Sequence, residues 1–108
     1  MSDKPLTLND MIGGWFIGDF DPTVVKTDAF EVGVKHYVAG DKDAAHYHKI
    51  AREITLVVSG TVRMIDQVWE AGSIIDIEPG KVNQFEALTD ATVTVVKIPS
   101  AKNDKYLV

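Results

Sequence analysis

The sequence contains no cysteine, which excludes disulfide bonds and thiolate metal sites. It also lacks a basic run. Its 11 Lys and Arg residues are scattered and its net charge is −5, so neither nucleic acid nor an anionic membrane is expected as a partner. No apolar run approaches the roughly 20 residues of a membrane helix, and no apolar signal segment is visible near the start. We therefore expect a cytoplasmic protein.

The composition predicts a single globular domain. The chain has 108 residues, of which 45% are hydrophobic and 25% charged, a mixture typical of soluble proteins. We expect one domain over residues 1–108, with its core at about residues 29–98, an N-terminal extension and a short C-terminal tail. The polar tail residues could fold over the site, but a solvated tail is favoured. These residues are Lys102, Asp104, Lys105 and Tyr106.

Short alternating segments separated by Gly, Pro and Asp turns indicate many strands and almost no helix. The strands are expected at residues 15–17, 24–26, 29–38, 46–48, 53–59, 62–65, 68–69, 74–78, 83–88 and 92–98. A tight hairpin is expected to turn at Asp66 and Gln67. This pattern favours an all-β sandwich or small barrel.

One predicted strand, which starts at Glu53, is apolar on both faces. If Glu53 faces the interior, three apolar side chains of the same strand face outward. These are Ile54, Leu56 and Val58. A strand that is apolar on both faces is usually covered on both faces, and a domain of this size has little of its own to cover the outer one. We therefore expect a homodimer.

Metal-binding residues concentrate in one short segment. His46 and His48 are two residues apart, so on a strand their imidazoles point to the same face, and Glu53 follows after four intervening residues. Imidazole together with carboxylate suits a divalent transition metal. We predict one such ion, with zinc, iron, manganese and nickel as the candidates.

The residues that frame this segment resemble the first signature of the cupin family. The chain reads Gly40, DKDAA, HYH, KIAR, Glu53, ITLVVS and Gly60, and every fixed position and gap fits. The second cupin signature is similar to the segment that begins GSIIDIEPG at Gly72, but the histidine that usually follows is absent. Asn83 stands where that histidine is usual.

The resemblance implies a jelly-roll barrel, the cupin double-stranded β-helix, that holds a divalent metal. His46, His48 and Glu53 would bind the ion, and Asn83 or water would complete its shell. Gln84 would replace Asn83 if the strand register slipped by one residue. The two ends of the chain look like those of small single-domain cupins from bacteria and phage, a subgroup associated with surface-sugar genes.

Four further residues are candidates for substrate binding. Lys35 and Tyr37 share one face of their strand; they would be acid or base groups near the metal if that face looks inward, and solvated if it looks outward. Arg52 either holds an anionic group or is a solvated loop residue. Phe85 is expected to line the pocket and exclude water.

These observations lead to two main functional hypotheses. The first is a metal-dependent isomerase, epimerase, lyase or oxygenase that acts on a small polar molecule such as a sugar derivative. The second is a non-catalytic module that binds or senses a small ligand, which the loss of a ligand at Asn83 favours. A structural dimer with an empty barrel is the third. No residue is assigned as catalytic, because fold alone does not fix function.

Overall fold

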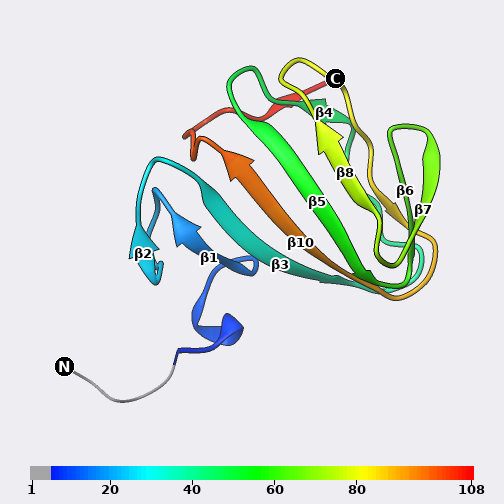
Figure 1. Cartoon of the computed structure of the whole chain (residues 1–108), viewed down its shortest axis with the longest axis horizontal. Coiled ribbons are helices and arrows are strands. Elements are labelled where there is room, and N and C mark those ends of the chain that lie inside the picture. Colours follow the sequence, from blue (N-terminus) through cyan, green and yellow to red (C-terminus); the bar gives the residue numbers. More distant parts are fainter. Residues whose placement is uncertain (1–5) are drawn as a thin grey trace.

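The computed structural model describes residues 6–108 and consists of short strands with a single 3-10 turn, η1 (Figure 1). The predicted all-β class is confirmed. Residues 1–5 of the predicted extension lie outside the described residues. The elements are η1 (Leu8–Asp10), β1 (Trp15–Gly18), β2 (Val25–Lys26), β3 (Glu31–Tyr37), β4 (His46–Tyr47), β5 (Arg52–Ser59), β6 (Thr61–Met64), β7 (Gln67–Glu70), β8 (Ile74–Ile77), β9 (Glu86–Ala87), β10 (Ala91–Ile98) and β11 (Tyr106–Leu107).

The strands form three sheets. The largest has the order β2-β1-β3-β10-β5-β8, a smaller one the order β7-β6-β9, and β11 pairs with β4. The long antiparallel strands β3, β10 and β5 form the curved centre of the large sheet (Figure 1). Hydrogen bonds do not close the sheets into a continuous ring among residues 6–108, so the predicted barrel is open.

The hydrophobic core lies between the large sheet and the β6–β9 region. It is built from alternate residues of the central strands, which point to the same face because side chains in a strand alternate. The large sheet contributes Val57, Ile75, Ile77, Ala91, Val93 and Val95, and the opposite side contributes Val62, Met64, Phe85 and Ala87.

The inner face of the large sheet changes from apolar to polar along its strands. The register of β10 with β5 pairs Val93 with Val57 at the apolar end and Lys97 with Glu53 at the polar end. The same β10 residue Lys97 pairs with Glu31 of β3. Because alternation and antiparallel pairing act together, three strands place their polar inward side chains at one end of the molecule. This end holds the candidate site.

Two local predictions were wrong in detail. The β6–β7 hairpin turns at Ile65 and Asp66, one residue earlier than expected, because Met64 pairs with Gln67. Both turn residues have positive φ, 43° and 59°, as a two-residue hairpin requires. The predicted strand over residues 83–88 is reduced to β9, with Asn83 joined to His46 by an isolated bridge.

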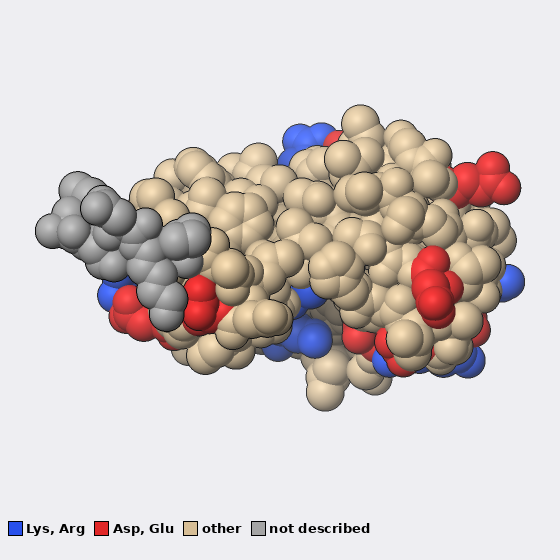
Figure 2. All heavy atoms as spheres, turned by 90° about the horizontal axis from the view of Figure 1, so that it is seen from below, with Lys and Arg blue, Asp and Glu red and all other residues tan. Residues whose placement is uncertain are grey.

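The surface carries small groups of both charge signs. On the face shown in Figure 2, uncharged residues dominate, and Lys, Arg, Asp and Glu side chains lie in small groups, several of them near its edges. None of the helical structure in residues 6–108 has the length and apolar character needed to cross a membrane.

Candidate functional site

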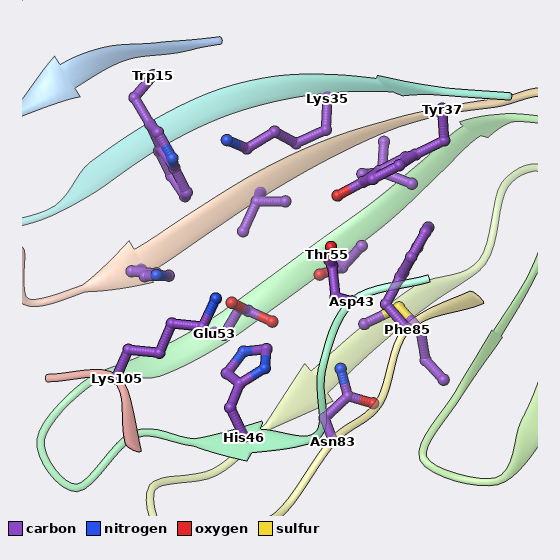
Figure 3. Close-up of a pocket in the computed structure, with 14 residues that line it drawn as sticks. Trp15, Lys35, Tyr37, Asp43, His46, Glu53, Thr55, Asn83, Phe85 and Lys105 are labelled. Carbon is purple, nitrogen blue, oxygen red and sulfur yellow. The ribbon is translucent and has the colours of Figure 1, made fainter. Parts of the chain in front are cut away.

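A cavity of about 300 Å³ opens at the polar end of the core (Figure 3). This volume is at the lower limit of typical small-molecule pockets. Its wall is formed by inward side chains of β3, β5 and β10, by β1, and by the segments around His46, Asn83 and Lys105. The lining residues are Trp15, Lys35, Tyr37, Asp43, His46, Glu53, Thr55, Met64, Asn83, Phe85, Val93, Val95, Lys97 and Lys105.

The two histidines of the predicted metal site lie next to each other. His46 is on β4 and His48 directly follows it, and their ring centroids are 5.3 Å apart. His46 Nδ1 lies 2.9 Å from the carbonyl oxygen of Ala44, and His48 Nδ1 lies 2.7 Å from that of Asp104. A carbonyl oxygen only accepts, so each Nδ1 donates, and in the neutral imidazole each Nε2 then has a free lone pair.

Glu53 completes this group from β5, the next strand along the chain. Its carboxylate oxygen Oε1 is 3.7 Å from Nε2 of the buried His48. Burial tends to raise the pKa of Glu53, but His48 in its protonated form, Lys97 and protonated His46 lower it below its ordinary value. Glu53 is therefore an ionised carboxylate beside two imidazoles.

The donor chemistry of this group fits a divalent transition metal. His48 Nε2 is buried and has no hydrogen-bond partner among residues 6–108, which is unusual for a polar atom. An ion would satisfy that atom, and hydrogen bonds from the other ring nitrogen to a carbonyl are the usual support of a metal-binding histidine. Within the described part of the chain, however, no three His, Asp or Glu side chains already converge at ligand distances. Joint binding by His46, His48 and Glu53 thus needs small side-chain rotations and stays a prediction.

Asn83 lies beside His46, as expected, but its side-chain oxygen is already engaged. The Ile65 backbone N–H donates to Oδ1 of Asn83 at 2.9 Å. Two backbone hydrogen bonds between His46 and Asn83, at 2.8 and 3.0 Å, hold the residue in place. The amide nitrogen therefore faces the cavity (Figure 3), and a protonated amide nitrogen is not a metal ligand. In this arrangement water is the better fourth ligand, and Gln84 is exposed and does not line the cavity.

Three of the four predicted substrate-binding residues line the cavity. Lys35 and Tyr37 of β3 point inward, which settles the alternative that the sequence left open. Phe85 packs against Tyr37 with ring centroids 4.3 Å apart. Burial, then the carboxylates of Asp43 and Glu53, raise the pKa of Tyr37, so its phenol is protonated and can donate a hydrogen bond.

Arg52, the fourth, lies outside the cavity. It is exposed, and its guanidinium binds both carboxylate oxygens of Asp76 on β8. The physical reason is alternation: Glu53 faces inward, so its neighbour Arg52 faces outward. The expectation that Arg52 holds an anionic substrate group has no support in this geometry.

Sequence reasoning missed several residues of the cavity. Trp15 and Lys97 were not among the predicted site residues, and Lys105 was expected in a solvated tail. For Lys97 a signal existed, since it continues the inward alternation of Val93 and Val95. Lys105 and Trp15 come from segments outside the signatures, and only the fold brings them to the cavity.

The C-terminal tail belongs to the site, so the prediction of a solvated tail was wrong. Strand β11 pairs with β4, and the ring of Tyr106 stacks on that of Tyr47 at 5.4 Å. Asp104 is buried and its carboxylate accepts hydrogen bonds from the backbone N–H groups of residues 49, 50 and 51. Burial tends to raise the pKa of Asp104, but these three donors and His48 lower it overall. The tail is thereby fixed against the loop that carries His48.

Solved structures share this fold. An uncharacterized conserved protein with a double-stranded β-helix domain from Klebsiella pneumoniae has a TM-score of 0.71 at 18% identity, over 99% of this chain and 98% of that chain. KdgF from Halomonas sp. has a TM-score of 0.64 at 18% identity, over 71% and 74% of the two chains. A sugar phosphate isomerase of the cupin superfamily from Silicibacter pomeroyi has a TM-score of 0.61 at 24% identity, over 65% and 50%.

These likenesses establish the fold. The chain has the double-stranded β-helix architecture of the cupins, as its two signatures predicted, although the sheets are not closed. No protein-family model and no curated protein matches the sequence.

Proposed function

We propose that this chain with the cupin fold is a metal-dependent enzyme that acts on a small polar molecule in the cavity. The observation that carries the proposal is the state of the two histidines. Both Nδ1 atoms are held by backbone carbonyls, so both Nε2 atoms are free to bind an ion beside the ionised Glu53. Zinc, iron, manganese and nickel are all compatible with two imidazoles and one carboxylate.

The surrounding residues support chemistry on a polar substrate. A bound ion would supply Lewis acidity toward a carbonyl or hydroxyl oxygen. The protonated phenol of Tyr37 lies on the same cavity wall and can donate a hydrogen bond to a substrate oxygen. Tyr37 and Phe85, packed against each other, exclude water from the apolar side of the cavity.

The reaction class is an isomerisation, epimerisation, elimination or oxygenation, and a sugar derivative is the preferred substrate. Among the structural neighbours, a sugar phosphate isomerase provides a precedent for sugar chemistry on this fold. That precedent supports the proposal at the level of fold only. A cytoplasmic location and a homodimer also stay predictions.

A binding or sensing module is the rival function, and the geometry at Asn83 favours it. The oxygen of Asn83 is engaged by Ile65, so the protein offers two imidazoles and one carboxylate where cupins usually offer a fourth side chain. A weakly held ion would suit a protein that binds a ligand without transforming it.

Metal analysis with a matched set of histidine variants tests the proposal. The chain has three histidines, and His36 lies on the outer face, where its Nδ1 contacts the Thr92 hydroxyl. We expect one equivalent of a divalent transition metal in the wild-type protein and in the control His36→Ala. His46→Ala and His48→Ala should lose both the metal and the stabilisation that added metal gives in thermal unfolding.

Turnover then separates the two functions. An enzyme should convert at least one sugar or carbonyl substrate, and the His48→Ala variant should not. A binding module should keep its ligand affinity and show no turnover with the metal present. Equal metal content in the His36→Ala, His46→Ala and His48→Ala variants would overturn the assignment of the site.

A further inference from the structure

Three lysines converge on the cavity from distant parts of the chain. Lys35 comes from β3, Lys97 from β10 and Lys105 from the segment before β11. Figure 3 shows Lys35 and Lys105 on different sides of the cavity. None of them lies within 4.0 Å of a carboxylate in residues 6–108. Five basic residues elsewhere on the protein do have such a partner. They are Lys26, Lys42, Arg52, Arg63 and Lys102. Lys49 and Lys81 also lack such a partner among residues 6–108, so three of the five unpaired basic residues lie where a ligand would sit.

Two of these lysines lie against one aromatic ring. The ammonium nitrogen of Lys35 is 4.5 Å from the ring centroid of Trp15, and that of Lys97 is 5.0 Å from it. Cation–π contacts favour each ammonium group at the ring, but they also bring two positive charges close together. Burial, and then the charge of Lys97, lower the pKa of Lys35, while the carboxylates of Asp43 and Glu31 oppose this shift. An anion between the two would remove the repulsion.

One of the lysines, Lys35, is also held in place by the backbone. Lys35 Nζ donates to the carbonyl oxygen of Gly13, which uses one of its three donors and leaves the others for a ligand. Gly33 lies opposite Trp15 in the β1–β3 pairing. A Cβ atom at Gly33 would lie 2.7 Å from the indole ring. The glycine therefore permits the close approach of the ring.

The charge of the cavity differs from that of the protein. The chain has a net charge of −5, yet the cavity wall carries three lysines against the two carboxylates Asp43 and Glu53. Glu53 belongs to the proposed metal site, so its charge would be offset by an ion. A cavity with a net positive charge and low-dielectric walls concentrates anionic ligands. The lysines of the cavity wall therefore favour anionic ligands in the cavity, although the protein as a whole is acidic.

We propose that Lys35, Lys97 and Trp15 form a subsite for the anionic group of the substrate, with Lys105 at its rim. The substrate class is a small hydroxylated molecule that carries a carboxylate or a phosphate. Its anionic group lies between the two lysines, and its hydroxyl or carbonyl oxygens point toward His46 and Glu53. This assignment rests on the proposed function for the polar end of the substrate, but the anion subsite itself needs no metal.

Binding of three related probes in the presence of a chelator tests the subsite. Glycerate, glycerol 3-phosphate and glycerol share a carbon skeleton and differ in the anionic group. We expect calorimetry to detect glycerate or glycerol 3-phosphate, with an affinity that falls as salt is added, and not glycerol. The tighter of the two anions identifies carboxylate or phosphate as the natural group. Equal binding of glycerol, or no binding of either anion, would overturn the proposal.

Lysine variants locate the subsite. Lys35→Met and Lys97→Met should each weaken anion binding on the order of tenfold, the effect of losing one charge-assisted hydrogen bond. Lys42→Met, an exposed lysine outside the cavity, is the matched control. Lys35→Arg keeps the positive charge and should retain most of the affinity, which separates loss of charge from damage to the fold. Unchanged binding in Lys35→Met and Lys97→Met would place the anion elsewhere.

The two proposals can fail separately. The probes are measured in chelator, so their binding does not depend on the metal site. A protein that binds anions through Lys35 and Lys97 but takes up no metal would keep the subsite and lose the proposed enzyme. A protein that loses metal in His48→Ala but binds no anion would keep the metal site and lose the subsite.

Discussion

His48 Nδ1 donates a hydrogen bond of 2.7 Å to the backbone carbonyl oxygen of Asp104, 56 residues further along the chain. The side chain of the same aspartate accepts hydrogen bonds from three consecutive backbone N–H groups, starting at Lys49. One tail residue thus binds both the imidazole and the loop that follows it. The C-terminal tail sets the orientation of a predicted metal ligand.

Asp104→Ala should loosen this connection. The three N–H groups around Ile50 would lose a charged acceptor, so we expect the free energy of unfolding to fall by about 2–3 kcal/mol in urea titrations. Metal affinity should fall by roughly tenfold or more, as for other residues that orient ligands. Asp104→Asn keeps one acceptor oxygen and should show a smaller loss of both. Stability and metal affinity equal to the wild type in Asp104→Ala would contradict the role of the tail.

Asn83→Ala tests whether the Asn83 side chain supports the fold or binds metal. The Ile65 N–H would lose its acceptor, so the free energy of unfolding should fall by about 1–3 kcal/mol. Since Oδ1 is directed to Ile65, this loss should be the same with excess metal and with a chelator. A loss seen only with metal present would show instead that Asn83 is a ligand. Urea titrations under both conditions distinguish these outcomes.

Gly33→Ala should displace the indole of Trp15. The new Cβ would lie 2.7 Å from the ring, closer than non-bonded atoms approach, while the backbone of Gly33 itself is not in the left-handed region. We expect a shift in tryptophan fluorescence and weaker anion binding with Lys35 and Lys97 unchanged. Gly40→Ala is the steric control, because a Cβ there meets nothing within 4 Å. Its φ of +94° adds local strain, so its stability must be measured beside its fluorescence.

Much of the site could be predicted from local spacing. His46 and His48 are two residues apart in an extended segment, so they share one side, and the structure brings Glu53 next to His48 from β5, with His46 and Glu53 lining the cavity. Once Glu53 is known to face inward, alternation also determines that Lys35 faces inward, because β10 pairs with both β3 and β5. The sequence alone does not show which strands are neighbours, and so the facing of Lys35 was left open.

The remaining errors have a common physical origin in contacts between distant segments. Arg52, for which a ligand contact and a solvated position were both open, is the exception, because local alternation from Glu53 already places it outside. The tail was expected in solvent because its residues are polar, but Asp104 is buried with a full set of donors. Asn83 or water was expected to complete the metal shell, and in the structure the Ile65 N–H of the hairpin donates to the Asn83 oxygen. Such partners are supplied by the tertiary fold and leave no periodic signal in the sequence.

The outer face of the large sheet leads to a last prediction, which concerns assembly. Leu56 on β5 is 37% exposed, as the apolar outer pattern of β5 predicted. Ile74, its partner on the neighbouring strand β8, is 67% exposed. A surface whose centre is apolar and uncharged is complementary to a second copy of itself, so the expected homodimer should pair these faces. Leu56→Asp would place a charge in the interface, and we expect a monomer in sedimentation analysis at micromolar concentration. Val68→Asp, at an exposed apolar residue of β7 in the other sheet, should stay dimeric. A wild-type monomer, or equal dissociation of both variants, would contradict this interface.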